Sequence, residues 1–209
     1  MGLQLHRKLT HLFYLLGLLF LSSNINALDI SIDGVLDEKE WSEAREWTKY
    51  YESMPFSLAE PKHFQKVLIQ EDEKGMYFGF INLQSKDSIR ANKHERDDEM
   101  ANADKCGLAI DFDGDGLTAY GFTVSAGGSI SDGIYRNEND VNYDWDADWD
   151  SATSINNDGW TVEVENQNTR KKTYFKCNYS GAPNVQCSAR GEAVAPELHV
   201  AAALIKLET

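Results

Sequence analysis

Three aspartates separated by single residues stand between two apolar alternating segments. They are Asp111, Asp113 and Asp115, and a glycine follows the last of them. Carboxylates at alternate positions of a tight turn converge on one hard cation, which is the spacing of a calcium-binding loop. The positions that supply the later ligands of an EF-hand loop hold Ala119 and Phe122 instead. The pattern therefore leaves two interpretations: a structural calcium site, or an acidic hairpin turn whose glycines adopt positive φ.

A second acidic segment contains tryptophans. Trp145 and Trp149 alternate with aspartates that include Asp146 and Asp148. In an extended chain the tryptophans face one side and these aspartates the other. Aromatic rings stack on the C–H bonds of sugars and carboxylates accept hydrogen bonds from their hydroxyls, so the segment predicts a carbohydrate site, with Tyr135 as a further stacking candidate. The other interpretation places the tryptophans in the core and leaves the acids as a solvated face.

No motif in the sequence indicates catalysis. Glycoside hydrolases need two carboxylates about 5 to 10 Å apart, one of them with a raised pKa. The chain has 34 aspartates and glutamates, so chance alone supplies pairs at such a distance and no pair stands out. The sequence contains neither a nucleophile elbow nor a phosphate-binding loop. We therefore expect a protein without enzymatic activity, and a glycoside hydrolase is the alternative.

The three cysteines form no redox or zinc motif. Cys106 lies in an apolar alternating segment and is expected to be a buried thiol, whereas Cys177 and Cys187 are ten residues apart in a polar segment. A disulfide between the last two is compatible with an oxidising compartment, and their spacing does not decide whether it forms.

The N-terminus has the three parts of a secretory signal. Arg7 and Lys8 form a basic start, residues 12–21 are apolar, and small residues lead to Ala27. The apolar run is about half of the roughly 20 residues that span a bilayer, which favours a cleaved signal over the alternative of a permanent membrane anchor. We expect cleavage after Ala27 and a mature protein that is periplasmic, associated with the outer membrane or secreted.

The net charge of −14 narrows the range of partners. A chain this acidic repels phosphate backbones and anionic lipid headgroups, so nucleic acids and membrane surfaces are not expected as partners. Divalent cations and neutral ligands, oligosaccharides and polysaccharides among them, are compatible with the charge.

Short alternating segments with almost no helix between them must position these residues. The alternation predicts a strand over 28–34, hairpins over 64–83 and 105–124, further strands beginning at Ile130 and Trp160, and a long loop over 85–104. A short helix is expected after the first strand, with Asp37 as its N-terminal cap. About seven short strands and one helix favour an antiparallel β-sandwich over a parallel α/β sheet.

The same pattern predicts a single folded domain. It covers residues 28–165 and follows a signal peptide of residues 1–27. Residues 166–209 are mostly polar and lack periodicity, so we expect an atypical, poorly ordered tail.

Three segments resemble the carbohydrate-binding family 9-like domains. They are 32–41 (IDGVLDEKEW), 110–124, and 145–163, which begins WDADW and ends DGWTVE. The chain is similar to the version at the N-terminus of large exported bacterial proteins whose remainder looks like an outer-membrane barrel, and the likeness covers about residues 29–165. The resemblance implies a jelly-roll β-sandwich, carbohydrate binding, and an ancillary place in polysaccharide breakdown or uptake. The polar tail stands where the family continues with further strands, so we expect a truncated or frame-shifted chain.

Together these features predict a non-catalytic carbohydrate-binding module. The alternative is a structural or interaction domain of an envelope protein that binds no sugar. Burial of the two tryptophans separates the two, because ligand-stacking rings must line a groove or an open surface.

Overall fold

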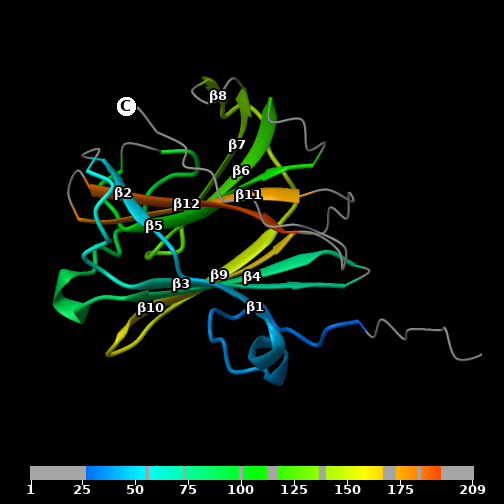
Figure 1. The fold of residues 1–209 in the computed structure, drawn as a ribbon, viewed down its shortest axis with the longest axis horizontal. Coiled ribbons are helices and arrows are strands. Elements are labelled where there is room, and N and C mark those ends of the chain that lie inside the picture. Colours follow the sequence, from blue (N-terminus) through cyan, green and yellow to red (C-terminus); the bar gives the residue numbers. More distant parts are fainter. Residues whose placement is uncertain are drawn as a thin grey trace, which may run out of the picture.

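The computed structural model describes residues 27–54, 57–72, 74–98, 101–112, 117–136, 140–166, 173–182 and 185–193, with side chains up to residue 166 except at 53 and 54. Two antiparallel sheets pack face to face (Figure 1). The structure confirms the predicted all-β antiparallel sandwich.

The first sheet has five strands in the order β1-β3-β4-β10-β9, namely Arg45–Trp47, Gln65–Glu71, Met76–Leu83, Gly159–Asn166 and Asp150–Ile155. The second has seven in the order β2-β12-β11-β5-β6-β7-β8, namely Tyr51–Met54, Val185–Ala193, Thr173–Ala182, Lys105–Asp111, Thr118–Ser125, Ile130–Arg136 and Asp140–Asn142. The helical elements of the described residues are two short 3₁₀ helices, η1 (Lys39–Glu43) and η2 (Lys86–Ser88).

The core lies between the inner faces of the two sheets. Strand side chains alternate between faces, so every second residue of a strand points inward. The inward residues are large and apolar on both sheets, and those that are almost completely buried include Phe78, Phe80, Val162, Ile110, Phe122 and Val124. The hairpins expected over 64–83 and 105–124 are present as β3–β4 and β5–β6.

Residues 28–34 form no strand, contrary to the expectation from their sequence. Their apolar side chains do alternate as expected, and pack on the outer face of the first sheet. The backbone, however, finds side-chain acceptors rather than a neighbouring strand: the Leu28 N–H donates to Asp72 (2.8 Å) and the Ser31 N–H to Glu38 (2.9 Å). Apolar alternation shows that one side of an extended chain is buried, and it does not require backbone hydrogen bonds to a neighbouring strand.

The expected helix is present as η1, with a different start. Asp37 is not its cap; Glu38 occupies the N-cap position and makes no side-chain capping bond. Trp41 is buried as expected, packed against the outer face of the first sheet. A short 3₁₀ helix is enough to bury this indole. The predicted capping pattern therefore does not start a longer α-helix.

Two strands lie where the sequence predicts a poorly ordered tail. β11 pairs with β5, and β12 pairs with β11 and β2. Strands pair through backbone N–H and C=O groups, and every residue except proline carries both. Pairing therefore does not need the apolar alternation on which strand prediction depends. The register places Cys177 opposite Ala189 and Cys187 opposite Tyr179; whether the two cysteines pair lies outside the described side chains.

The predicted signal peptide falls on residues 1–26, which lie outside the described residues, and on Ala27. Within the described ranges, no helix combines the length and the apolar content that a membrane crossing takes.

Candidate functional site

Two tyrosines cover a pair of glycines on the outer face of the second sheet. Gly121 of β6 and Gly133 of β7 are direct partners in the ladder. A Cβ atom at Gly121 would lie 2.2 Å from Cε2 of Tyr135. One at Gly133 would lie 2.9 Å from the backbone oxygen of Asn142, 3.1 Å from Cγ1 of Val141 and 3.2 Å from Cδ1 of Tyr143. The ring of Tyr135 therefore occupies space that a larger side chain at Gly121 would fill, and the ring of Tyr143 lies beside Gly133 together with β8. We call Gly121, Gly133, Tyr135 and Tyr143 the tyrosine shelf.

Strand alternation places the tyrosine shelf on the solvent side of the sheet. Tyr120 and Phe122, the neighbours of Gly121 along β6, belong to the core, so the glycine points away from it. Tyr135 pairs with Val141 of β8, and Tyr143 follows that strand closely. Both tyrosines are partly exposed. Partly exposed rings with a phenolic O–H that donates and accepts hydrogen bonds suit the stacking and bonding of a sugar.

The two tryptophans predicted to bind sugar pack in the core instead. Trp149 is 8 % exposed and meets Phe122 edge-on, with 5.2 Å between ring centroids. Trp145 is partly buried, with its ring centroid 5.0 Å from that of Tyr120 and 6.1 Å from that of Phe122. The expected alternation is present, with the tryptophans inward and the aspartates between them outward. This arrangement corresponds to the core interpretation.

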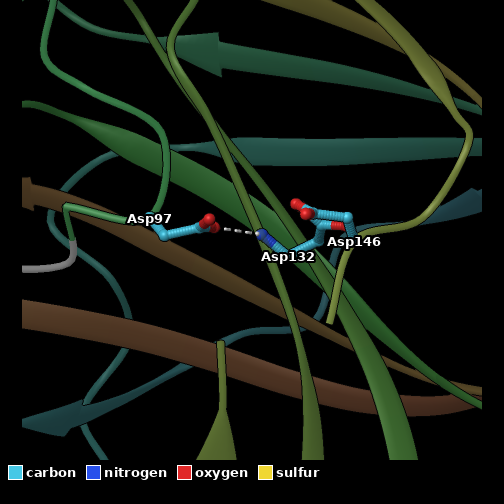
Figure 2. A group of neighbouring side chains, drawn as sticks. All are labelled: Asp97, Asp132 and Asp146. Atoms are coloured by element: carbon cyan, nitrogen blue, oxygen red, sulfur yellow. Dashed lines mark hydrogen bonds between the residues drawn. The ribbon is translucent and has the colours of Figure 1, made fainter. Parts of the chain in front are cut away.

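Asp146 belongs to a group of three aspartates from separate segments. Asp97 comes from the long loop before β5, Asp132 from β7, and Asp146 from the chain after β8 (Figure 2). One carboxylate oxygen from each lies within 4.8 Å of the other two. The backbone N–H of Asp132 donates to the Asp97 carboxylate at 3.0 Å. Three hard oxygen donors at this spacing are the kind that a divalent cation takes.

Arg96 already supplies a positive charge to this group. Its guanidinium contacts the carboxylate of Asp132, whose side chain is fully buried, and its Nε lies 2.9 Å from Asp146 and 3.7 Å from Asp97. The Ala147 N–H donates to the second oxygen of Asp132 at 2.6 Å. The protein therefore balances the buried charge itself, and the cluster fastens the long loop and the 145–149 segment to β7.

The predicted calcium loop is described only at its first aspartate. Asp111 ends β5 and is 4 % exposed. Asp113 and Asp115 lie outside the described residues. Asp148, the remaining predicted ligand residue, is exposed on the solvent side of its segment.

A buried ion pair fixes the beginning of the long loop. The Asp104 carboxylate is fully buried and accepts hydrogen bonds from the Arg90 side chain (2.8 Å), the Arg90 backbone (3.0 Å) and the Gln84 amide (2.7 Å). The charged residues that make this loop look solvent-exposed in the sequence thus include Arg90 and Asp104, which hold it in place through a buried ion pair.

A cleft of about 340 Å³ lies on the other sheet, beside β1. Its lining is Glu43, Ala44, Arg45, Ile69, Gln70 and Glu71, which includes none of the site residues predicted from the sequence. Arg45 and Glu71 stand 3.8 Å apart across it, and both are well exposed. An exposed pair of this kind gives the cleft no strong preference for either sign of charge.

Sequence reasoning missed Arg96, Asp97, Asp132 and Tyr143 as members of sites. Arg96 and Asp132 are 36 positions apart, and no local pattern connects them. The glycines opposite each other in β6 and β7 were a usable signal for the tyrosine shelf, because glycine inside a strand often marks a close approach.

No protein-family model, no curated protein and no solved structure matches the chain.

Proposed function

We propose that this protein is a non-catalytic carbohydrate-binding module whose tyrosine shelf stacks on sugar rings. The observation that carries the proposal is the placement of Tyr135 and Tyr143 over the paired glycines on the outer face of the second sheet. The resemblance to carbohydrate-binding family 9-like domains supports the same conclusion, and the jelly-roll connectivity which that resemblance implies is part of the proposal.

The chemistry of the tyrosine shelf suits a neutral polysaccharide. Aromatic rings meet the apolar C–H faces of a sugar, and phenolic hydroxyls exchange hydrogen bonds with its hydroxyls. The net charge of −14 disfavours anionic glycans. Stacking on partly exposed rings is weak per contact, so binding is expected to depend on several adjacent sugar units.

The proposal transfers the binding role from the tryptophans to the tyrosines. Trp145 and Trp149 support the sheet from inside, and Asp146 is engaged by Arg96. Of the residues predicted from the sequence, Tyr135 is a member of the tyrosine shelf, and Asp148 is exposed to solvent.

Retardation on polysaccharide gels, preceded by a glycan array to find the sugar, tests this function. Tyr135→Ala and Tyr143→Ala are expected to lose retardation while remaining folded by near-UV circular dichroism. Phe64→Ala is the matched control, because Phe64 is an aromatic residue 48 % exposed at the end of the other sheet. Equal retardation of all four proteins, or no glycan bound at all, would contradict the proposal.

The packing of Trp145 and Trp149 in the core favours a second candidate function. A structural or interaction domain of an envelope protein needs no exposed stacking residue, and it accounts for both tryptophans. An array on which no glycan binds, for a protein shown to be folded, supports this candidate over the first.

Export and calcium binding complete the proposal. N-terminal sequencing of the protein recovered outside the cytoplasm tests cleavage after Ala27. Calorimetric titration with calcium, with and without Asp113→Ala, tests the loop that begins at Asp111; heat that is absent in both proteins would end that part of the proposal.

A further inference from the structure

A buried glutamate holds the N-terminal segment, residues 28–44, on the first sheet. Glu163 of β10 is 0 % exposed. Its Oε2 accepts hydrogen bonds from the backbone N–H groups of Asp33 (3.0 Å) and Gly34 (2.8 Å), and its Oε1 accepts one from the indole N–H of Trp41 (3.0 Å). One carboxyl group thus joins two parts of the domain that are more than 120 residues apart in sequence.

A second carboxyl group shares the same indole. Oε2 of Glu38 lies 3.1 Å from Nε1 of Trp41, and Oε1 of Glu38 accepts the Ser31 N–H. Neither Glu38 nor Glu163 makes an ion pair in the part of the chain that the structure describes. Two carboxylates on one N–H, one of them removed from water, repel each other when both are ionised.

The elements around Glu163 present acids rather than bases. Its direct partners, Gly79 on β4 and Ala152 on β9, are uncharged. The titratable side chains on the same strands, two positions from these partners or from Glu163, are Tyr77, Asp150 and Glu165. The N-terminal segment adds Asp33 and Glu38. The nearby lysines are paired elsewhere, Lys39 with Glu40 and Lys66 with Glu46.

Burial raises the pKa of Glu163 above its ordinary value, and the neighbouring Glu38 adds to the rise. The hydrogen bonds from Gly34, Asp33 and Trp41 act in the opposite direction and do not cancel it. A carboxyl group whose pKa is higher in the folded state stabilises the fold at low pH, and that contribution is lost as the pH rises through the folded-state pKa.

We propose that Glu163 and Glu38 form a proton-dependent clasp, which holds the N-terminal segment on the first sheet while the pair keeps one proton and loosens it when both are ionised. Opening releases that proton to water and breaks no covalent bond. It separates Trp41 from Leu68 and Tyr77 of the first sheet, whose apolar surface the segment covers when closed. The clasp acts on the opposite sheet from the tyrosine shelf and does not depend on sugar binding.

Limited trypsin digestion of the full chain tests the clasp. Lys39 and Arg45 lie in or next to the N-terminal segment, so cleavage after them, followed by mass spectrometry, reports its opening. The matched variant is Glu163→Gln, which keeps an acceptor for the two backbone N–H groups and carries no charge at any pH. The cleavage rates of wild type and variant are compared at the same pH, so the pH dependence of trypsin itself cancels.

Cleavage of the wild type relative to Glu163→Gln is expected to rise as the pH increases above 4.5, the ordinary pKa of a glutamate, and through the raised pKa of Glu163, by up to about tenfold for each unit by which that pKa is raised. Glu38→Gln removes the second charge and is expected to flatten the rise as well. Glu43→Gln, an exposed acid of η1, should behave as wild type. A wild-type ratio that stays constant with pH overturns the proposal, and so does a Glu38→Gln variant whose cleavage relative to Glu163→Gln rises as steeply as that of the wild type.

Discussion

Arg96 places its guanidinium on the carboxylate of Asp132, whose side chain is fully buried on β7. The pair joins the long loop before β5 to a strand 36 residues later in the sequence. The Asp132 carboxylate also accepts a hydrogen bond from the Ala147 N–H, so one buried acid orders two segments whose described residues contain no strand.

Replacing Arg96 with methionine is expected to lower the free energy of unfolding by about 3 kcal/mol, because it leaves a buried carboxylate without its cation. Denaturant unfolding measures the change. Arg45→Met removes an arginine from the exposed pair with Glu71 and should cost less than about 1 kcal/mol. Equal losses in the two variants would show that Arg96 is no more than a surface charge.

Trp149→Ala is expected to destabilise the protein by about 3 to 5 kcal/mol, since it opens a cavity beside Phe122 in the core. The measurement is again denaturant unfolding, with the exposed Phe64→Ala as control. A loss of glycan binding with unchanged stability would instead return Trp149 to the ligand-binding role that its sequence context suggests.

Gly121→Ala is expected to displace the ring of Tyr135, because the added Cβ would lie 2.2 Å from its Cε2. The tyrosine can rotate away, so stability should change by less than about 1 kcal/mol. Polysaccharide affinity should fall several-fold, corresponding to the loss of about 0.5 to 1.5 kcal/mol of stacking. Tyr135→Phe keeps the ring and should retain most of the affinity; undiminished binding by Gly121→Ala would count against the tyrosine shelf.

The free energy of unfolding of the wild type, relative to Glu163→Gln, is expected to decrease as the pH rises through the raised pKa of Glu163. The sign follows from burial, because the folded state holds this proton more tightly than the unfolded chain does. Denaturant unfolding at a series of pH values measures it. A difference that grows with pH would mean that the three N–H donors outweigh burial and lower the pKa instead.

Much of the fold was predictable from local pattern. The β3–β4 and β5–β6 hairpins, and the inward tryptophans and outward aspartates of the 145–150 segment, all follow from a two-residue period, and the long loop before β5 follows from the lack of one. That period is visible in the sequence because each strand has one buried and one exposed face. The same rule missed β11 and β12, whose backbone pairing needs no apolar alternation, and predicted a strand over 28–34, where alternation occurs without a ladder.

The candidate sites depend on neighbours that the sequence does not make adjacent. The sequence by itself determined which residues carry chemistry and which face of a segment is apolar, since both are local properties. Only the tertiary structure decided that Gly121 lies opposite Gly133, that Arg96 meets Asp132, and that Glu163 reaches Gly34. Register and long-range pairing are set by how the whole core packs, so no short stretch of sequence contains them.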